Sequence, residues 1–130
     1  MPESRTIAPP LTLPASRRLR LAREFTVVHA KGLRIGDGFF TMAYTSNNLG
    51  AARIGLAISK RAIGKKSVDR NRIRRLIRES FRLNQHQLPA VDVVVSARHR
   101  AQGADRAQLR ASLESLWKKL AATCESSRSV

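Results

Sequence analysis

The chain has 130 residues, enough for one domain with a buried core and too few for two independent ones. Its 25 Lys and Arg against nine Asp and Glu give a formal net charge of +16 and predict a polyanionic partner. No stretch approaches the roughly 20 apolar residues of a membrane-spanning helix. Binding to an anionic membrane surface would need an amphipathic basic helix with large exposed hydrophobic side chains. Nucleic acid is therefore the favoured class of partner.

The two ends of the chain and its cysteine carry little functional signal. The first 16 residues, with three prolines after position 8, predict a disordered basic arm and have too few consecutive apolar residues for a secretory signal. The single cysteine, Cys124, has no partner for an internal disulfide, which suits a reducing cytoplasm. We therefore expect a cytoplasmic protein with a frayed tail over residues 123–130.

The first half of the chain predicts one helix and two strands. Apolar residues recur at helical spacing over Ala22–Lys31, and Gly32 follows as a helix stop. From Leu33 the period changes to two, which predicts a strand. One face of that strand carries Phe40, Met42 and Tyr44. After a polar turn at 46–50, residues 52–59 predict a second strand, antiparallel to the first.

The second half predicts two long helices around one strand. A short basic connection, 60–66, leads into a helix over 67–82, with Ser67 as its N-cap. Val91–Ala97 is the most β-prone run and predicts a buried central strand. The last helix, 105–122, begins with the spacing of a capping box, Asp105 and Gln108. Its apolar stripe consists of Leu109, Leu113, Leu116, Trp117 and Leu120. The elements predict an α+β domain with helices on a small sheet.

The helix over 67–82 carries six arginines, opposed only by Asp69 and Glu79. Projected at 100° per residue, its apolar face holds Ile73, Leu76, Ile77 and Phe81. The opposite face holds Asn71, Arg72, Arg74, Arg75, Arg78 and Arg82. Like charges four residues apart cost about 0.2 to 0.5 kcal/mol per pair, which indicates a counter-charge from a partner. The alternative is a merely solvated face. Arginine favours phosphate, because its planar fork pairs with two oxygens.

The run RNRIRRLIRE from Arg70 to Glu79 resembles the signature helix of the protein subunit of bacterial ribonuclease P, which trims the 5′ leader from precursor tRNA. Residues 54–61 and 92–95 also resemble family segments, and the resemblance extends over 17–120. It implies an αβββαβα sandwich with a small central sheet, helices packed on it and a left-handed βαβ crossover (ribosomal protein S5 domain 2-like). Ile35 would belong to an additional short strand.

The resemblance implies a protein that binds the catalytic RNA and the 5′ leader of precursor tRNA. It would assist Mg²⁺-dependent endonucleolytic removal of the leader as a subunit of the holoenzyme, with Mg²⁺ bound mainly by the RNA and the protein alone inactive. The implied partners are the catalytic RNA and precursor tRNA, with no membrane and no obligate protein partner. Residues 17–122 would form the single RNA-binding domain. The acids are scattered, so we expect no catalytic or metal-binding residue on the protein.

Two surfaces are expected from this resemblance. The surface facing the catalytic RNA comprises Lys60, Arg61, Lys65, Lys66, Arg70, Asn71, Arg72, Arg74, Arg75 and Arg78. A cleft for the leader comprises Arg18, Phe25, Phe40 and Ser59. Its aromatic side chains would stack on unpaired bases, although a core position is the alternative for both phenylalanines. Trp117 is expected in the core. The rival functions are a ribosomal or general RNA-binding protein and a stand-alone nuclease, the latter disfavoured by the scattered acids.

Overall fold

The computed structural model describes residues 17–19, 22–47 and 49–129, without the side chains of 124–129. The arm predicted over residues 1–16 lies outside the described part. The elements in chain order are α1 (Ala22–Lys31), β1 (Leu33–Gly36), β2 (Phe40–Ser46), β3 (Arg53–Ala57), α2 (Lys60–Ile63), α3 (Ser67–Asn84), η3 (Gln85–Gln87), β4 (Val91–Ala97), η4 (His99–Gly103) and α4 (Arg106–Ser129). This is the predicted α+β class, and Ile35 lies in the additional strand β1 as the resemblance implied.

The four strands form one mixed sheet in the order β1-β2-β4-β3. The predicted antiparallel pairing of β2 with β3 is wrong, because β4 lies between them, antiparallel to β2 and parallel to β3. β4 is buried at every position except the half-buried Ser96, as expected for a central strand. The parallel pair β3 and β4 is joined through α3, which makes the βαβ crossover. The backbone amide of Leu19 donates to the carbonyl of Ile54 and covers part of the outer edge of β3.

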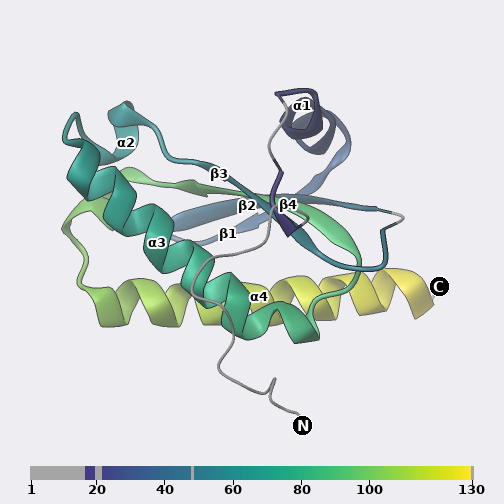
Figure 1. Cartoon of the computed structure of the whole chain (residues 1–130). Coiled ribbons are helices and arrows are strands. Elements are labelled where there is room, and N and C mark those ends of the chain that lie inside the picture. Colours follow the sequence, from purple (N-terminus) through teal and green to yellow (C-terminus); the bar gives the residue numbers. More distant parts are fainter. Residues whose placement is uncertain (1–16, 20–21, 48, 130) are drawn as a thin grey trace, which may run out of the picture.

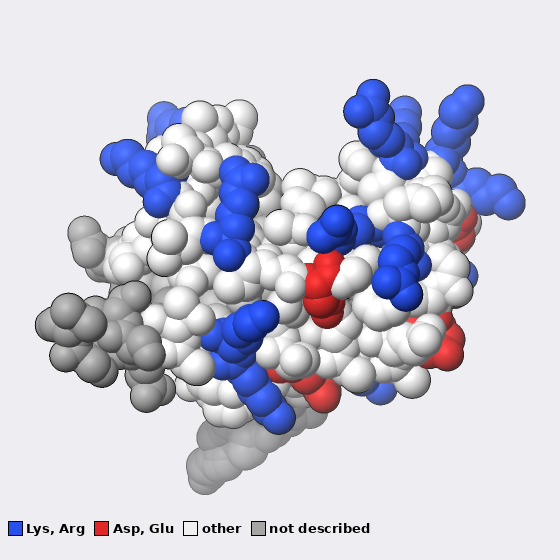
Figure 2. All heavy atoms as spheres, turned by 180° about the vertical axis from the view of Figure 1, so that it is seen from behind, with Lys and Arg blue, Asp and Glu red and all other residues white. Residues whose placement is uncertain are grey.

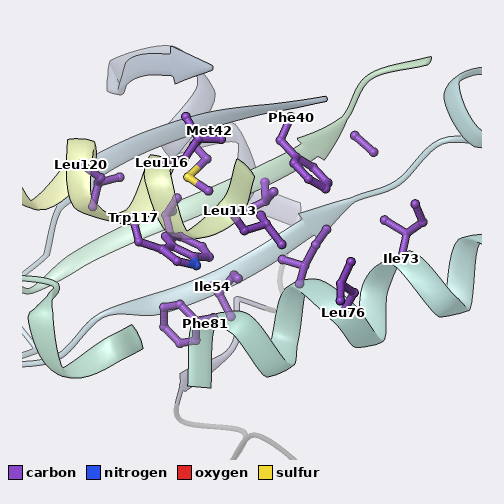
Figure 3. Close-up of a cluster of buried hydrophobic side chains, with 14 of the residues drawn as sticks. Phe40, Met42, Ile54, Ile73, Leu76, Phe81, Leu113, Leu116, Trp117 and Leu120 are labelled. Carbon is purple, nitrogen blue, oxygen red and sulfur yellow. The ribbon is translucent and has the colours of Figure 1, made fainter. Parts of the chain in front are cut away.

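Helices cover the two faces of the sheet unequally. α3 and α4 lie side by side on one face, and α1 lies on the other (Figure 1). The main core lies under α3 and α4 and includes Phe40, Met42, Phe81 and Trp117 (Figure 3). Trp117 is fully buried, as predicted, and its indole Nε1 donates to Ser80 Oγ at 2.9 Å. The smaller cluster under α1 consists of Leu19, Val28, Ala43 and Val94, with Phe25 packed against it.

The ends of α1 and α4 follow local chemistry. α1 has the predicted bounds, and a Cβ on Gly32 would lie 2.3 Å from the Val28 carbonyl oxygen, so only glycine fits this stop. The capping box before α4 is confirmed. The backbone amide of Gln108 donates to Asp105 Oδ1, and the backbone amide of Asp105 donates to Gln108 Oε1. α4 runs to Ser129, past the predicted end at residue 122, because no Pro or Gly interrupts it.

Two predictions around the basic connection are wrong. Ser67 is the first residue of α3 and not its cap; the cap position is Lys66, without a side-chain hydrogen bond. The stretch predicted as a connection contains the short helix α2. Ser59 provides its cap, because Ser59 Oγ accepts a hydrogen bond from the Ala62 amide at 3.1 Å.

Candidate RNA-binding surfaces

The arginines of α3 occupy two flanks of the helix. The apolar face predicted for α3 is buried on the sheet and α4, as Figure 3 shows for Ile73, Leu76 and Phe81. Arg72 and Arg75 lie on the flank toward η4 and the start of α4, where both line a pocket. Arg74 and Arg78 lie on the other flank, near Arg18 of the N-terminal segment. The predicted cationic face is therefore divided into two arginine pairs, one on each side of the helix as it lies on the sheet.

The flank near Arg18 brings three positive charges together, those of Arg18, Arg74 and Arg78. Burial lowers the pKa of Arg78, and the charges of Arg18 and Arg74 lower it further. Within the described part of the chain, no arginine of α3 forms an ion pair with a carboxylate. The Nε atoms of Arg18 and Arg82 are buried and have no acceptor there. An unmet buried donor costs about 1 to 3 kcal/mol, so these two guanidinium groups are incompletely hydrogen-bonded within the described part of the chain.

The start of α3 holds its polar side chains in place. Arg70 Nη1 donates to the Gly64 carbonyl at 2.8 Å, and Arg74 Nη1 donates to Asn71 Oδ1 at 2.9 Å. Gly64 has a φ of 112°, in the region that only glycine adopts readily, so the loop depends on this residue to present its carbonyl. Arg70, Asn71 and Arg74 are therefore fixed before any ligand arrives, which lowers the entropy cost of binding.

The four other predicted cations lie at one end of the molecule. Lys60, Arg61, Lys65 and Lys66 are exposed on and after α2, and Figure 2 shows blue side chains crowding the upper right of the molecule, over α2. Because β3 and β4 are parallel, the segments that follow them meet at the same edge of the sheet. There, His99 Nδ1 lies 3.2 Å from the Ala62 carbonyl oxygen, which joins η4 to α2.

This meeting of α2 and η4 adds cations that the sequence did not reveal as part of the surface. Arg98 and Arg100 follow β4 and are exposed. Arg98 Nη1 donates to the Asp37 carbonyl at 3.2 Å, and the guanidinium of Arg100 lies 5.4 Å from the centroid of the Phe39 ring. Only the parallel pairing of β3 with β4 brings these two arginines to the cationic end, and a single sequence does not reveal which strands pair.

Asp37 shapes the turn that carries Phe39. Its carboxylate accepts from the amides of Phe39 and Phe40 at 2.8 and 3.0 Å and from the hydroxyl of Ser112 on α4. Burial alone would raise the pKa of Asp37, but these hydrogen bonds and the charge of Arg98 lower it overall. Asp37 is therefore a structural carboxylate that ties the β1–β2 turn to α4.

The sheet face under α1 continues into an open groove. Gly36, Thr41, Ser96 and Ala57 lie side by side across all four strands, and each is exposed or half-buried. Figure 2 shows a hollow between the raised ends formed by α1 and α2. Phe25 borders this floor, because a Cβ on Gly55 would lie 2.7 Å from Phe25 Cζ. The small floor residues allow an extended chain to approach the sheet closely.

The four residues predicted for the leader cleft do not form one site. Phe25 is half-buried at the groove, whereas Phe40 is fully buried and packs in the main core on the opposite face. The prediction for Phe40 is wrong, because its place in the strand puts it with Met42 and Tyr44. Ser59 is exposed, but its hydroxyl caps α2. Arg18 lies near Arg78, at the edge of β3.

A salt-bridge network fixes α1 on the sheet. Arg53 Nε and Nη2 donate to the two oxygens of Asp92 at 2.9 and 2.8 Å, and Arg53 Nη1 donates to Glu24 at 3.1 Å. Asn47 Nδ2 also donates to Asp92, at 2.8 Å. The hydrogen bonds to Asp92 raise the pKa of Arg53. Because Glu24 precedes Phe25, the network holds the aromatic ring at the groove. Arg53 is paired with these two carboxylates and is therefore not counted among the cations available to RNA.

The described part of the chain contains neither a metal-binding cluster nor a membrane-spanning helix. No group of three His, Cys, Asp or Glu side chains there is placed to hold a metal ion. None of the described helices is long and apolar enough to cross a membrane.

The comparison with known proteins agrees with this architecture. The family model described as Ribonuclease P matches residues 13–121. The chain belongs to the ribonuclease P protein family. It is 41% identical to the "Ribonuclease P protein component" of Thioalkalivibrio sulfidiphilus over 85% of this chain and 92% of the relative. The protein of the same name from Idiomarina loihiensis is 52% identical over 65% of this chain and 67% of the relative.

Solved structures of ribonuclease P proteins share the fold. The protein of Staphylococcus aureus gives a TM-score of 0.74 at 29% identity, covering 78% of this chain and 93% of that one. Two structures of the Thermotoga maritima protein, each 29% identical, give TM-scores of 0.72 and 0.71. Both matches cover 78% of this chain, with 97% and 96% of the respective Thermotoga chain. The family's known role is RNA binding and processing of precursor tRNA, as part of the ribonuclease P holoenzyme, an endoribonuclease. The predicted family and its role in RNA binding and precursor tRNA processing are thereby confirmed.

Proposed function

We propose that this protein binds the catalytic RNA subunit through α2 and α3 and holds the 5′ leader of precursor tRNA in the groove under α1. The observation that carries the proposal is the cationic flank of Arg18, Arg74 and Arg78. Arg18 and Arg74 both lie close enough to Arg78 to repel it, and no carboxylate among the described residues forms an ion pair with the arginines of α3. A phosphate backbone would supply the missing negative charge.

The surface for the catalytic RNA comprises the ten predicted residues with Arg98 and Arg100 added. Guanidinium and ammonium groups spread over a rigid helix and the adjoining end of the sheet bind phosphates and fix orientation, without reading sequence. The hydrogen bonds of Arg70 and Asn71 support this assignment, because they hold the start of α3 in one arrangement.

The groove suits a single strand of any sequence. Its floor of Gly36, Thr41, Ala57 and Ser96 lacks bulky or charged side chains that would select particular bases. Phe25 at its border offers a ring on which a base can stack, and stacking contributes about 1 to 3 kcal/mol per base whatever its identity. A processing enzyme with many precursor substrates needs this tolerance.

The remaining assignments follow from the family and the distribution of acids. We propose that Mg²⁺ is bound mainly by the RNA subunit, since the described carboxylates do not gather into a metal site. We also propose a cytoplasmic particle, with residues 17–122 as the RNA-binding domain. Single-stranded leader and catalytic RNA would then meet along one continuous protein surface.

Reconstitution tests this function against its rivals. Protein added to the catalytic RNA and precursor tRNA at low Mg²⁺ should restore cleavage, and the protein alone should cleave nothing. Cleavage by the protein alone would indicate a stand-alone nuclease, and binding without rescue would indicate a general RNA-binding protein.

Charge reversal tests the surface itself. Arg78→Glu should weaken binding to the catalytic RNA and reduce the salt dependence of the affinity, because phosphate contacts release counterions. Lys118→Glu on the exposed side of α4 is the matched control. Equal salt slopes for wild type and Arg78→Glu would contradict the assignment.

A further inference from the structure

A pocket of about 320 Å³ lies between α3, α4 and η4, on the flank of α3 that faces away from Arg18. α3 and α4 diverge toward their N-terminal ends (Figure 1), and the pocket occupies this wedge. Its apolar lining consists of Ile63, Ile73, Leu76, Ala101, Ala104 and Leu109. Pockets of this size hold small organic groups with most of their surface buried.

Three of the six polar residues that line the pocket are arginines. Arg72 and Arg75 of α3 and Arg106 of α4 line it, together with the carboxylates of Asp69 and Glu79. Within the described residues, none of these three arginines pairs with a carboxylate, although two acids share the pocket with them. Glu79 instead contacts Arg110, 3.8 Å away.

Asp69 is the second unusual feature of the pocket. It is half-buried, and among the described residues its carboxylate forms no ion pair and accepts no hydrogen bond. A carboxylate beside an apolar lining is a natural acceptor for the amino group of a base. Phosphate alone would gain nothing from this acid.

We propose that this pocket receives one unstacked nucleotide of the catalytic RNA, with its base against the apolar lining and its flanking phosphates on Arg72, Arg75 and Arg106. The inference rests on the proposed function and extends it, because the pocket adjoins the surface assigned to that RNA. RNA-binding proteins commonly take unpaired bases into such sites and stack them on arginine planes. The carboxylate of Asp69 favours a base that carries an amino group.

The chemistry of the lining selects this occupant. A purely apolar ligand would not need three guanidinium groups, and a helical phosphate backbone would not enter an apolar hollow. A single nucleotide combines a flat, largely apolar base with negative charge on both sides. Continuity with α3 also matters, since Arg72 and Arg75 alternate along one helix with Arg74 and Arg78 of the proposed RNA surface.

Filling the hollow tests the inference while the cations remain. Ala104→Leu should occupy the space for the base and weaken binding to the catalytic RNA about 10-fold, with the salt slope unchanged. Ala111→Leu, on the exposed side of α4, adds the same atoms outside the pocket and should bind as wild type does. Thermal unfolding of both variants excludes loss of fold as the cause.

Removing a cation gives the complementary result. Arg72→Gln should lower the affinity for the catalytic RNA. It should also make the dependence of the affinity on salt concentration less steep, by the amount that one phosphate contact contributes. Lys118→Gln should leave this salt slope unchanged. Wild-type affinity in Ala104→Leu beside weakened binding in Arg78→Glu would overturn the pocket inference and leave the proposed function intact. No effect in any variant, with no rescue of cleavage, would overturn the proposed function itself.

Photocrosslinking identifies the occupant directly. Gln102 is exposed and lines the pocket, so a benzophenone-bearing amino acid at this position should react with a single unpaired nucleotide of the catalytic RNA. Mapping by reverse transcription should give one strong stop, which Ala104→Leu removes. Diffuse stops along double-helical segments would contradict the inference.

Discussion

The two faces of the sheet are built from the same four strands and have different roles. Under α3 and α4, large side chains such as Phe40 and Trp117 interlock in a core that excludes water. On the opposite face, α1 covers only part of the sheet and leaves a row of small residues in the groove. Alternation along the strands thus separates side chains that stabilise the fold from those available to a ligand.

The strongest test of this contrast is Phe40→Ala. The substitution should lower the free energy of unfolding by about 4 kcal/mol, because it removes a fully buried aromatic ring and leaves a cavity. Chemical denaturation of the isolated protein measures the loss. Phe25→Ala, at a half-buried residue on the opposite face, should cost less than half as much, and equal costs would mean that the two faces are not distinct.

Arg53→Met probes how α1 is held over the groove. It should destabilise the protein by about 3 kcal/mol, since it leaves the partly buried carboxylate of Asp92 without its main partner. Denaturation measures stability, and leader affinity should fall as well because α1 is no longer anchored. The double variant Arg53→Met with Asp92→Leu should recover part of the stability. No recovery would show that the network is not a coupled unit.

Phe25→Ala should mainly affect binding. Loss of one stacked base predicts a decrease of about 1 to 2 kcal/mol in affinity for precursor tRNA. Affinity for mature tRNA, which lacks the leader, should hardly change. Equilibrium binding of the reconstituted particle to both RNAs separates the cases, and equal losses would point to a packing role for Phe25.

Asp37→Asn should show a small effect that depends on pH. The folded-state pKa of Asp37 is below its ordinary value, so its ionised form stabilises the fold above the unfolded pKa of about 3.9. This contribution disappears as the pH falls through the folded pKa. Denaturation of wild type and variant should therefore differ by about 1 kcal/mol or less at neutral pH and converge under acid. A constant gap would contradict the ionic role.

The sequence predicted what depends on neighbouring residues. The apolar face of α3, the capping box of Asp105 and Gln108 and the Gly32 stop all have local causes, and the structure contains each of them. The order of the strands has no local cause. The hairpin expected after residue 46 was therefore replaced by pairing with β4, more than 40 residues later.

The same limit explains the differences in the candidate site. The period of two placed Phe40 on the correct face of its strand but could not say which face the larger helices cover. Arg98 and Arg100 became part of the cationic end only through the parallel pairing of β3 with β4. In contrast, the specific run from Arg70 to Glu79 identified the family before any strand was paired.

The central place of β4 has a consequence for synthesis. The sheet cannot close until residues 91–97 have left the ribosome, and α4 follows only after them. A nascent chain ending before β4 contains the arginine helix but lacks the strand on which it packs, and long-range pairing of this kind folds late. A chain released early would therefore expose its cations on an unfolded segment, and only a nearly complete one can assemble the particle.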